Sequence, residues 1–186
     1  MRCVFVSEME EGIRVIVSSS VLGDGYKRKI QTLEFWNNNK NNKYLSNDYS
    51  FILEDFDIPY KWMYSQMTNR IYEFDDSMIW VWTKRPDLRC SGYLEKGKKG
   101  VLLEIEISED NVLLSEFDLW HLPLMDITVE LYEDEQIEKK VSWERIFDLE
   151  LCSKLNEVNI EDLTLQGVTS KVPLSNVKLI KEFVAK

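Results

Sequence analysis

The chain contains one histidine and three cysteines among its 186 residues. Cys3, Cys90 and Cys152 are odd in number and far apart, so their spacing fits neither a disulfide framework nor a zinc ribbon. One histidine and three scattered thiols also fall short of a zinc cage, so we expect no metal site. This pattern is typical of structural thiols in a reducing compartment.

The sequence also lacks an apolar run long enough to cross a bilayer. Nothing at the N-terminus resembles a signal peptide, because the chain turns acidic at Glu8. We therefore expect a soluble, cytoplasmic protein with no membrane partner.

Positive charge is scarce as well. The formal net charge of -10 argues against bulk nucleic-acid binding through the overall field of the protein. Residues 84–99 nevertheless hold six basic and two acidic side chains, whereas residues 104–162 hold eighteen acidic and four basic ones. The basic stretch indicates either a solvated loop or a site for an anion such as a phosphate-bearing ligand.

The length and the 44% hydrophobic content favour a single domain over residues 1–186. Alternating apolar residues within residues 1–27 predict an additional N-terminal β-hairpin, ahead of a core formed by residues 28–186. A short strand at 29–32 precedes Thr32, which is suited to cap a helix beginning at Leu33. The asparagine-rich residues 37–42 predict a loop after that helix.

A second helix is predicted after Asp57, with Pro59 in its first turn. Its core-facing stripe is formed by Tyr60, Met63, Tyr64, Met67 and Ile71. Periodicity predicts further elements, namely strands at 78–83, 101–107 and 111–114, mainly helical structure at 126–151, and strands at 163–173 and 177–185. Without βαβ regularity, this mixture predicts an α+β fold with a mixed or antiparallel sheet and flanking helices.

Two tryptophans lie just before a pair of arginines. In a strand at 78–83, Trp80 and Trp82 project to the same face. In the segment that follows, Pro86 fixes the backbone, and Asp87 can orient one of the two guanidinium groups of Arg85 and Arg89. The other arginine is then left for bidentate contacts, and the tryptophans suit a stacked base or nicotinamide ring. The equal alternative is a hydrophobic face with a structural Arg-Asp pair.

A second candidate segment contains Ser115, Asp118, Trp120 and His121. A catalytic triad is excluded, because three side chains within seven residues do not converge from separate elements. The imidazole has a pKa range that permits acid-base work or ligand orientation, although a structural histidine is the commoner case. A phosphate-loop pattern at 92–98 is followed by Lys99 instead of Ser or Thr and by a strand, which excludes nucleotide-triphosphate hydrolysis.

Seven ordered blocks carry a family resemblance, including Ile30-Gln31-Thr32, Tyr60-Lys61-Trp62-Met63, Ile79-Trp80-Val81-Trp82, Pro86-Asp87-Leu88-Arg89, Phe117-Asp118-Leu119-Trp120-His121, Ser142-Trp143-Glu144-Arg145-Ile146-Phe147-Asp148 and Leu165-Gln166. From residue 29 onward the chain resembles an uncharacterised bacterial family known as domain of unknown function 3841. The resemblance implies no activity. It implies Gln31, Thr32 and Gln166 as further candidate ligand-binding residues.

The order of elements also resembles, more distantly, the small ADP-ribosyltransferase-like domains. That resemblance implies NAD as the bound cofactor. Such enzymes need an acidic residue on a late strand to stabilise the ribosyl cation, and residues 165–169 of this chain contain no acid.

These observations leave two functional hypotheses and one structural alternative. In the first, a cleft binds a nucleotide such as NAD with ADP-ribosyltransferase-like chemistry: Arg85 or Arg89 contacts phosphate, a tryptophan stacks on the base, and Asp118 with His121 orients the ribose. Its catalytic residues are Ser115, Asp118 and His121, and its ligand-binding residues are Gln31, Thr32, Trp80, Trp82, Arg85, Asp87, Arg89, Trp120 and Gln166. In the second, a non-catalytic acidic interaction or inhibitor protein, related to toxins or defence, binds a basic partner. In the third, the tryptophans only hold the fold.

Overall fold

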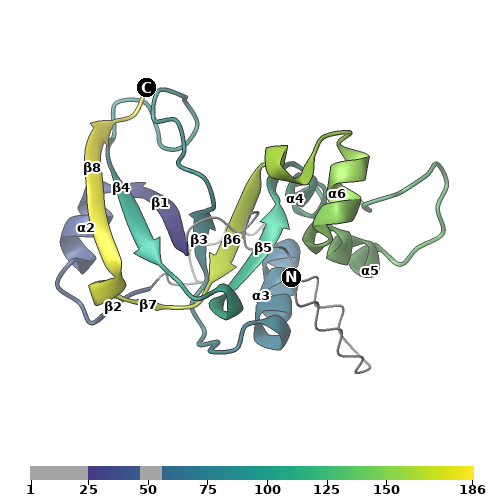
Figure 1. Ribbon diagram of the computed structural model, residues 1–186, viewed down its shortest axis with the longest axis horizontal. Coiled ribbons are helices and arrows are strands. Elements are labelled where there is room, and N and C mark those ends of the chain that lie inside the picture. The colour runs from purple at the N-terminus through teal and green to yellow at the C-terminus, as the bar shows by residue number, and fades with distance from the viewer. Residues whose placement is uncertain (1–24, 47–55) are drawn as a thin grey trace, which may run out of the picture.

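The computed structural model describes residues 25–46 and 56–186 (Figure 1). Its larger sheet has six strands: β1 (Tyr26–Thr32), β3 (Ile79–Trp82), β4 (Lys99–Glu106), β5 (Val112–Glu116), β6 (Leu165–Thr169) and β8 (Val177–Val184). Their order is β5-β6-β3-β1-β4-β8, and each neighbouring pair is antiparallel. A separate pair joins β2 (Tyr44–Leu45) to β7 (Val172–Pro173).

The α-helices are α2 (Leu33–Asn39), α3 (Asp57–Arg70), α4 (Phe117–Leu124), α5 (Lys139–Trp143) and α6 (Leu149–Leu155). Figure 1 shows α3, α4, α5 and α6 gathered at the β5-β6 end of the sheet, whereas α2 lies at the opposite end. The prediction of an α+β fold with flanking helices is confirmed, and the sheet is antiparallel throughout the described residues.

The junction of β1 and α2 follows from one side chain. The Phe35 backbone N–H donates to the hydroxyl oxygen of Thr32 at 3.1 Å, so Thr32 caps the helix as predicted. The predicted loop at 37–42 is partly wrong, because α2 continues to Asn39. The Asn39 side-chain amide donates back to the Phe35 carbonyl at 2.8 Å, and the Lys40 N–H bonds to the Trp36 carbonyl, which together complete the last turn.

The helix predicted after Asp57 is α3. Of its predicted stripe, Met63, Met67 and Ile71 are buried as expected. Trp62 was not part of that stripe, yet it is also buried, because its ring packs against Trp120 of α4, Trp143 of α5 and Phe147. The helix therefore presents a wider apolar face than the spacing alone indicated.

Strand β3 separates two parts of the core. Trp80 joins a cluster with residues of α3, α4 and α5, whereas Ile79 and Val81 join a cluster on the side of α2. The alternation of side chains along a strand explains this division. The predicted strand at 78–83, with Trp80 and Trp82 on one face, is confirmed in these respects.

The mainly helical structure predicted at 126–151 is only partly present. No helix occurs between α4 and α5, and helical residues resume at Lys139. Side chains of α5 satisfy backbone groups of this segment in place of helical hydrogen bonds: the Val129 N–H donates to Ser142 Oγ at 3.0 Å, and Trp143 Nε1 donates to the Ile127 carbonyl at 2.7 Å. The sequence pattern also missed α4 itself.

The other strands predicted within the described residues are present. The strands expected at 101–107 and 111–114 correspond to β4 and β5, and the C-terminal strands correspond to β6, β7 and β8. The predicted N-terminal hairpin falls almost wholly on residues 1–24, which lie outside the described residues. Its organisation with the rest of the chain as one domain stays a prediction. None of the helices in the described ranges has the length and apolar character needed to cross a bilayer.

Candidate functional site

One row of facing residues crosses five strands of the sheet. Arg28 on β1 lies opposite both Trp82 on β3 and Glu104 on β4. Trp82 lies opposite Gln166 on β6, which in turn lies opposite Ser115 on β5. Directly opposed residues of antiparallel strands project to the same face. The structure therefore brings three predicted site residues, Trp82, Gln166 and Ser115, into one row.

Polar contacts flank the indole of Trp82 within this row. On one side, Arg28 Nη2 lies 2.9 Å from Glu104 Oε2 in a partly buried ion pair. On the other side, Gln166 Nε2 donates to Ser115 Oγ at 3.4 Å, and both side chains are buried. Trp82 thus lies between an ion pair and an amide-hydroxyl pair.

Two aromatic rings contact Trp82, and a third ring contacts one of these two. Its ring centroid lies 4.9 Å from that of Phe117 at the start of α4 and 6.2 Å from that of Tyr93 in the loop after β3. Phe117 in turn packs edge-on against His121, with centroids 4.8 Å apart. We call Trp82, Tyr93, Phe117 and His121 the Trp82 cluster. Its first three rings are half-buried and His121 is exposed, so the cluster reaches the surface.

His121 has a defined tautomer when it is neutral. Its Nδ1 lies 3.0 Å from the carbonyl oxygen of Phe117, one turn earlier on α4. A carbonyl oxygen can only accept a hydrogen bond, so Nδ1 carries the proton and Nε2 is left as an acceptor. Because His121 is exposed, this acceptor is available to a bound molecule.

The three predicted catalytic side chains differ in accessibility. Ser115 is completely buried, whereas Asp118 and His121 are exposed. The hydroxyl of Ser115 bonds to Gln166 rather than to either of them. A serine nucleophile requires a base within hydrogen-bonding distance and access to substrate, and this arrangement supplies neither for Ser115.

The other two predicted site tryptophans belong to the core. Trp80 and Trp120 pack with ring centroids 5.4 Å apart, and Tyr60 lies edge-on to both at 6.0 Å. Trp120 is buried and stacks on Trp62. The Trp80 indole N–H is buried and has no hydrogen-bond partner among the described residues. Such an unpaired donor costs roughly 1–3 kcal/mol.

The loop after β3 contains one engaged arginine and one free arginine. Arg89 Nε donates to Asp87 Oδ1 at 2.9 Å and its Nη2 donates to Oδ2 at 2.7 Å. The hydrogen bonds from Arg89 lower the pKa of Asp87 to about 2. Arg85 is exposed and makes no ion pair with the described part of the chain. As expected, the aspartate orients one guanidinium and leaves the other unengaged.

Gln31 and Thr32 have local roles. The Gln31 side-chain oxygen accepts from the Thr32 backbone N–H at 3.3 Å, and Thr32 caps α2. Gln31 is an odd number of residues from Arg28 along the regular strand β1, so it projects to the face opposite Trp82. The structure therefore separates Gln31 from the Trp82 cluster.

Sequence reasoning missed Tyr93, Phe117 and the Arg28-Glu104 ion pair. Each comes close to Trp82 only through the folding of separate segments, so no local spacing signals them. The one available signal was the aromatic character of Phe117 beside the candidate residues Ser115 and Asp118.

Comparisons with known proteins identify a family but no characterised relative. The family model described as Domain of unknown function (DUF3841) matches residues 29–136, a range that includes all of β3, β4, β5 and α4. No curated protein and no solved structure gave a significant match. Since the matched range covers more than half of the 186 residues, this chain belongs to the DUF3841 family.

Proposed function

We propose that this chain binds a nucleotide-like ligand at the Trp82 cluster, and that NAD is the first compound to test. The supporting observation is the half-buried indole of Trp82, packed against Phe117 and Tyr93 and continued to the surface by His121. Every nucleobase has a flat face, and stacking on an aromatic side chain contributes about 1–3 kcal/mol per base.

Polar groups near the cluster fit the rest of a nucleotide. The Nε2 atom of His121 is free to accept a hydrogen bond from a ribose hydroxyl. Arg85 follows Trp82 by three residues, and no group in residues 25–46 or 56–186 accepts from its guanidinium donors, which suit a phosphate. Arg89 is the weaker candidate, because Asp87 already occupies two of its N–H groups.

Binding is a better-supported proposal than ADP-ribosyl transfer. In that reaction the bond between the ribose and nicotinamide breaks, and a carboxylate stabilises the positive charge that develops on the ribose. Strand β6 offers the neutral amide of Gln166 beside Trp82. Glu104 is the carboxylate in the same row, but its charge is engaged by Arg28. We therefore propose a binding domain and expect no release of nicotinamide.

Thermal unfolding tests this proposal directly. The purified chain is heated alone, with NAD and with ATP. A ligand at about 100 times its dissociation constant raises the unfolding free energy by roughly 2.7 kcal/mol. For a chain of this size that corresponds to a rise in Tm of about 5–11 °C. No shift with either nucleotide up to millimolar concentration would contradict the proposal.

Single substitutions assign the binding to this site. Arg85→Ala removes an exposed cation that has no ion-pair partner among the described residues, so it should weaken binding and leave the Tm of the free protein unchanged. Lys140→Ala is the matched control, because it removes an exposed positive charge on α5. Equal loss of affinity in both variants would show that overall charge, and not this site, attracts the nucleotide. Release of nicotinamide from NAD would contradict the proposal that the chain binds NAD without cleaving it.

A further inference from the structure

The segment between α4 and α5, residues 125–138, is an exposed acidic loop. It contains no helix or strand, and Figure 1 shows it extending past α5 and α6 at the edge of the molecule. Six of its residues are acidic and none is basic. We call this segment the α4-α5 loop. The loop begins just after α4, which carries Phe117 and His121, but it contains none of the four residues of the Trp82 cluster.

Large apolar side chains of this loop are exposed to solvent. Met125 is 59% exposed, Ile127 47% and Tyr132 66%, and Leu131 is exposed as well. A partner that covers these side chains would remove their apolar area from water, which favours association. In contrast, Val129 in the middle of the loop is buried and joins the core. The loop therefore has one inward anchor and several outward apolar groups.

Half of the acidic side chains of the loop make structural contacts within the protein. They are Asp126, which pairs with Lys139, Glu135, which pairs with Arg145, and Glu138, which caps α5. The other three, Glu130, Glu133 and Asp134, are exposed and make no ion pair within the described residues. These three carboxylates flank Leu131 and Tyr132 in the chain, so the free negative charges and the exposed apolar groups are interleaved.

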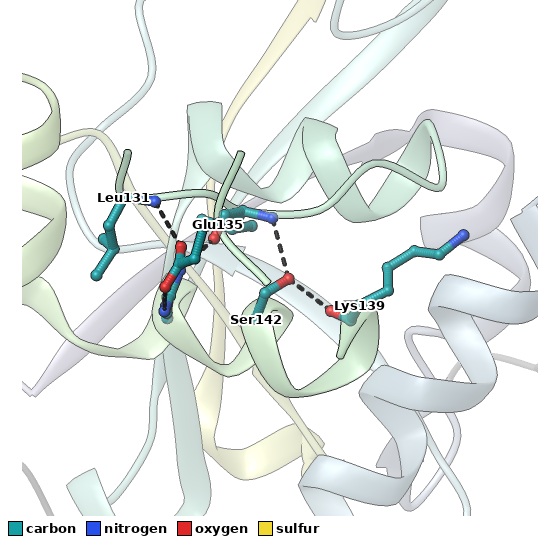
Figure 2. Close-up of polar contacts among 6 residues, drawn as sticks. Leu131, Glu135, Lys139 and Ser142 are labelled. Atoms are coloured by element: carbon teal, nitrogen blue, oxygen red, sulfur yellow. Dashed lines mark hydrogen bonds and ion pairs between the residues drawn. The ribbon is translucent and has the colours of Figure 1, made fainter. Parts of the chain in front are cut away.

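The tip of the loop is fixed by a bidentate ion pair. Arg145 Nη1 and Nη2 donate to the two carboxylate oxygens of Glu135 at 2.6 and 2.7 Å. Arg145 also donates to the Val129 carbonyl at 2.7 Å, and Glu135 accepts from the Leu131 backbone N–H at 2.9 Å (Figure 2). One pair of side chains thus joins both arms of the loop.

The base of the loop is fixed by α5. Ser142 Oγ donates to the Lys139 carbonyl at 2.6 Å, as Figure 2 shows, and it accepts from the Val129 N–H. Trp143 Nε1 donates to the Ile127 carbonyl. A backbone held in this way loses little conformational freedom when a partner binds, and preorganisation of this kind raises affinity. The network therefore fixes the backbone at Ile127, Val129 and Leu131, next to Tyr132.

We propose that the α4-α5 loop docks a basic amphipathic segment of a partner protein. Apolar side chains of that segment cover Leu131 and Tyr132, and its Lys and Arg residues pair with Glu130, Glu133 and Asp134. Charge selects this occupant. Nucleic acids and anionic membranes are repelled by the carboxylates, and a symmetric contact between two copies would bring the same acidic groups together.

The test uses a defined probe, a fluorescently labelled helical peptide of about 20 residues with leucines on one face and lysines on the other. Its affinity for the whole chain is measured by anisotropy at low and at high salt. We expect binding that weakens by about tenfold or more as salt screens the carboxylates. Absence of binding at low salt, or concentration-dependent dimerisation of the chain that the peptide does not disrupt, would overturn the proposal.

Matched variants distinguish the loop from general acidity. Tyr132→Ala should weaken binding roughly fivefold or more, whereas Tyr72→Ala, which removes a tyrosine 83% exposed elsewhere, should not. The neutral triple variant Glu130→Gln, Glu133→Gln, Asp134→Asn should bind the peptide with about tenfold lower affinity. The control triple variant is Glu109→Gln, Asp110→Asn, Glu182→Gln. Equal losses of peptide affinity in the loop and control variants would mean that the peptide is attracted by the overall negative charge of the protein and not by this loop.

Preorganisation has its own test. Glu135→Gln breaks the ion pair with Arg145 without changing any of the exposed apolar or unpaired acidic side chains. We expect weaker peptide binding than in the wild type, with the Tm of the free protein measured alongside to confirm that the variant is folded. Unchanged affinity in a folded Glu135→Gln variant would contradict the role assigned to the fixed loop.

Discussion

The carboxylate of Glu116 accepts a hydrogen bond from the backbone N–H of Leu119 at 2.7 Å. Glu116 is both the last residue of β5 and the N-cap of α4, so the helix begins immediately where the strand ends. This abrupt junction sets Phe117 against Trp82 and directs His121 to the surface one turn later. The Trp82 cluster therefore depends on a capping residue outside it.

Substitution of Glu116 tests this dependence. Glu116→Ala removes the cap and should lower the free energy of unfolding by about 0.5–2 kcal/mol. Glu116→Gln keeps an oxygen acceptor for the Leu119 N–H, and burial raises the pKa of Glu116 by disfavouring its charge, so this variant should retain most of the stability. Urea denaturation of both variants gives the comparison. Equal losses would show that the charge, and not the acceptor, is what α4 requires.

Two tryptophans with different hydrogen-bonding states offer a second test. Trp143→Phe removes the donor to the Ile127 carbonyl and leaves that carbonyl unpaired, whereas Trp80→Phe removes an N–H that has no partner in the described part of the chain. We expect the loss of unfolding free energy to be about 1–3 kcal/mol larger for Trp143→Phe. Chemical denaturation measures both. A loss for Trp80→Phe as large as that for Trp143→Phe would show that the Trp80 N–H is paired in solution.

Lys29 predicts a pH dependence in the alkaline range. Its Nζ donates to the Trp80 carbonyl at 3.2 Å, and burial lowers its pKa from 10.5 to about 8. Between these two values the unfolded chain holds the proton and the folded chain does not, so the unfolding free energy rises with pH. Below about 8, the folded chain bears the cost of a buried charge.

Lys29→Met should therefore raise the unfolding free energy near neutral pH. Its advantage over the wild type should shrink as the pH increases from about 8 toward 10.5, because the wild-type lysine becomes neutral. Urea denaturation across this range measures the difference. Lys178→Met, at an exposed position on β8, is the control and should give no such trend. A constant difference between Lys29→Met and the wild type would contradict a buried, depressed lysine.

The Glu135-Arg145 ion pair predicts that the stability of the protein depends on pH in the acidic range. The hydrogen bond from Arg145 lowers the pKa of Glu135 from 4.5 to about 2. The stability that this carboxylate contributes is complete above 4.5 and is lost as the pH falls toward 2, because the unfolded chain takes up the proton first. Glu135→Gln should thus be less stable than the wild type near neutral pH, and the gap should close below about 4.5. Acid titration of the Tm tests this, with Glu133→Gln as an exposed control expected to show no gap.

The parts of the fold that the sequence predicted depend on neighbours in the chain. The cap at Thr32, the helix after Asp57 and the shared face of Trp80 and Trp82 were all expected and are all present. A helix cap joins a side chain to a backbone N–H only three residues later, and side chains return to the same face every few residues in a helix or strand. Both features can therefore be predicted from a short stretch of sequence. The two arginines of the loop after β3 also divided into one paired and one free group as their spacing with Asp87 indicated.

The errors occur where distant segments compete with local preference. Residues 126–138 have an acidic, helix-like composition, but Ser142, Trp143 and Arg145 satisfy their backbone groups from outside the loop. Side chains of a later segment therefore replaced the hydrogen bonds that a helix would have formed.

By itself, the sequence determined the strand and helix periods, the acidic balance and the residue types available for a site, because these follow from local geometry and composition. Only the tertiary structure decided that Trp82 meets Gln166 across β6 and Phe117 from α4, while Trp80 and Trp120 turn into the core. Strand register and packing between separate segments made that division, and neither is encoded in the spacing of any single stretch.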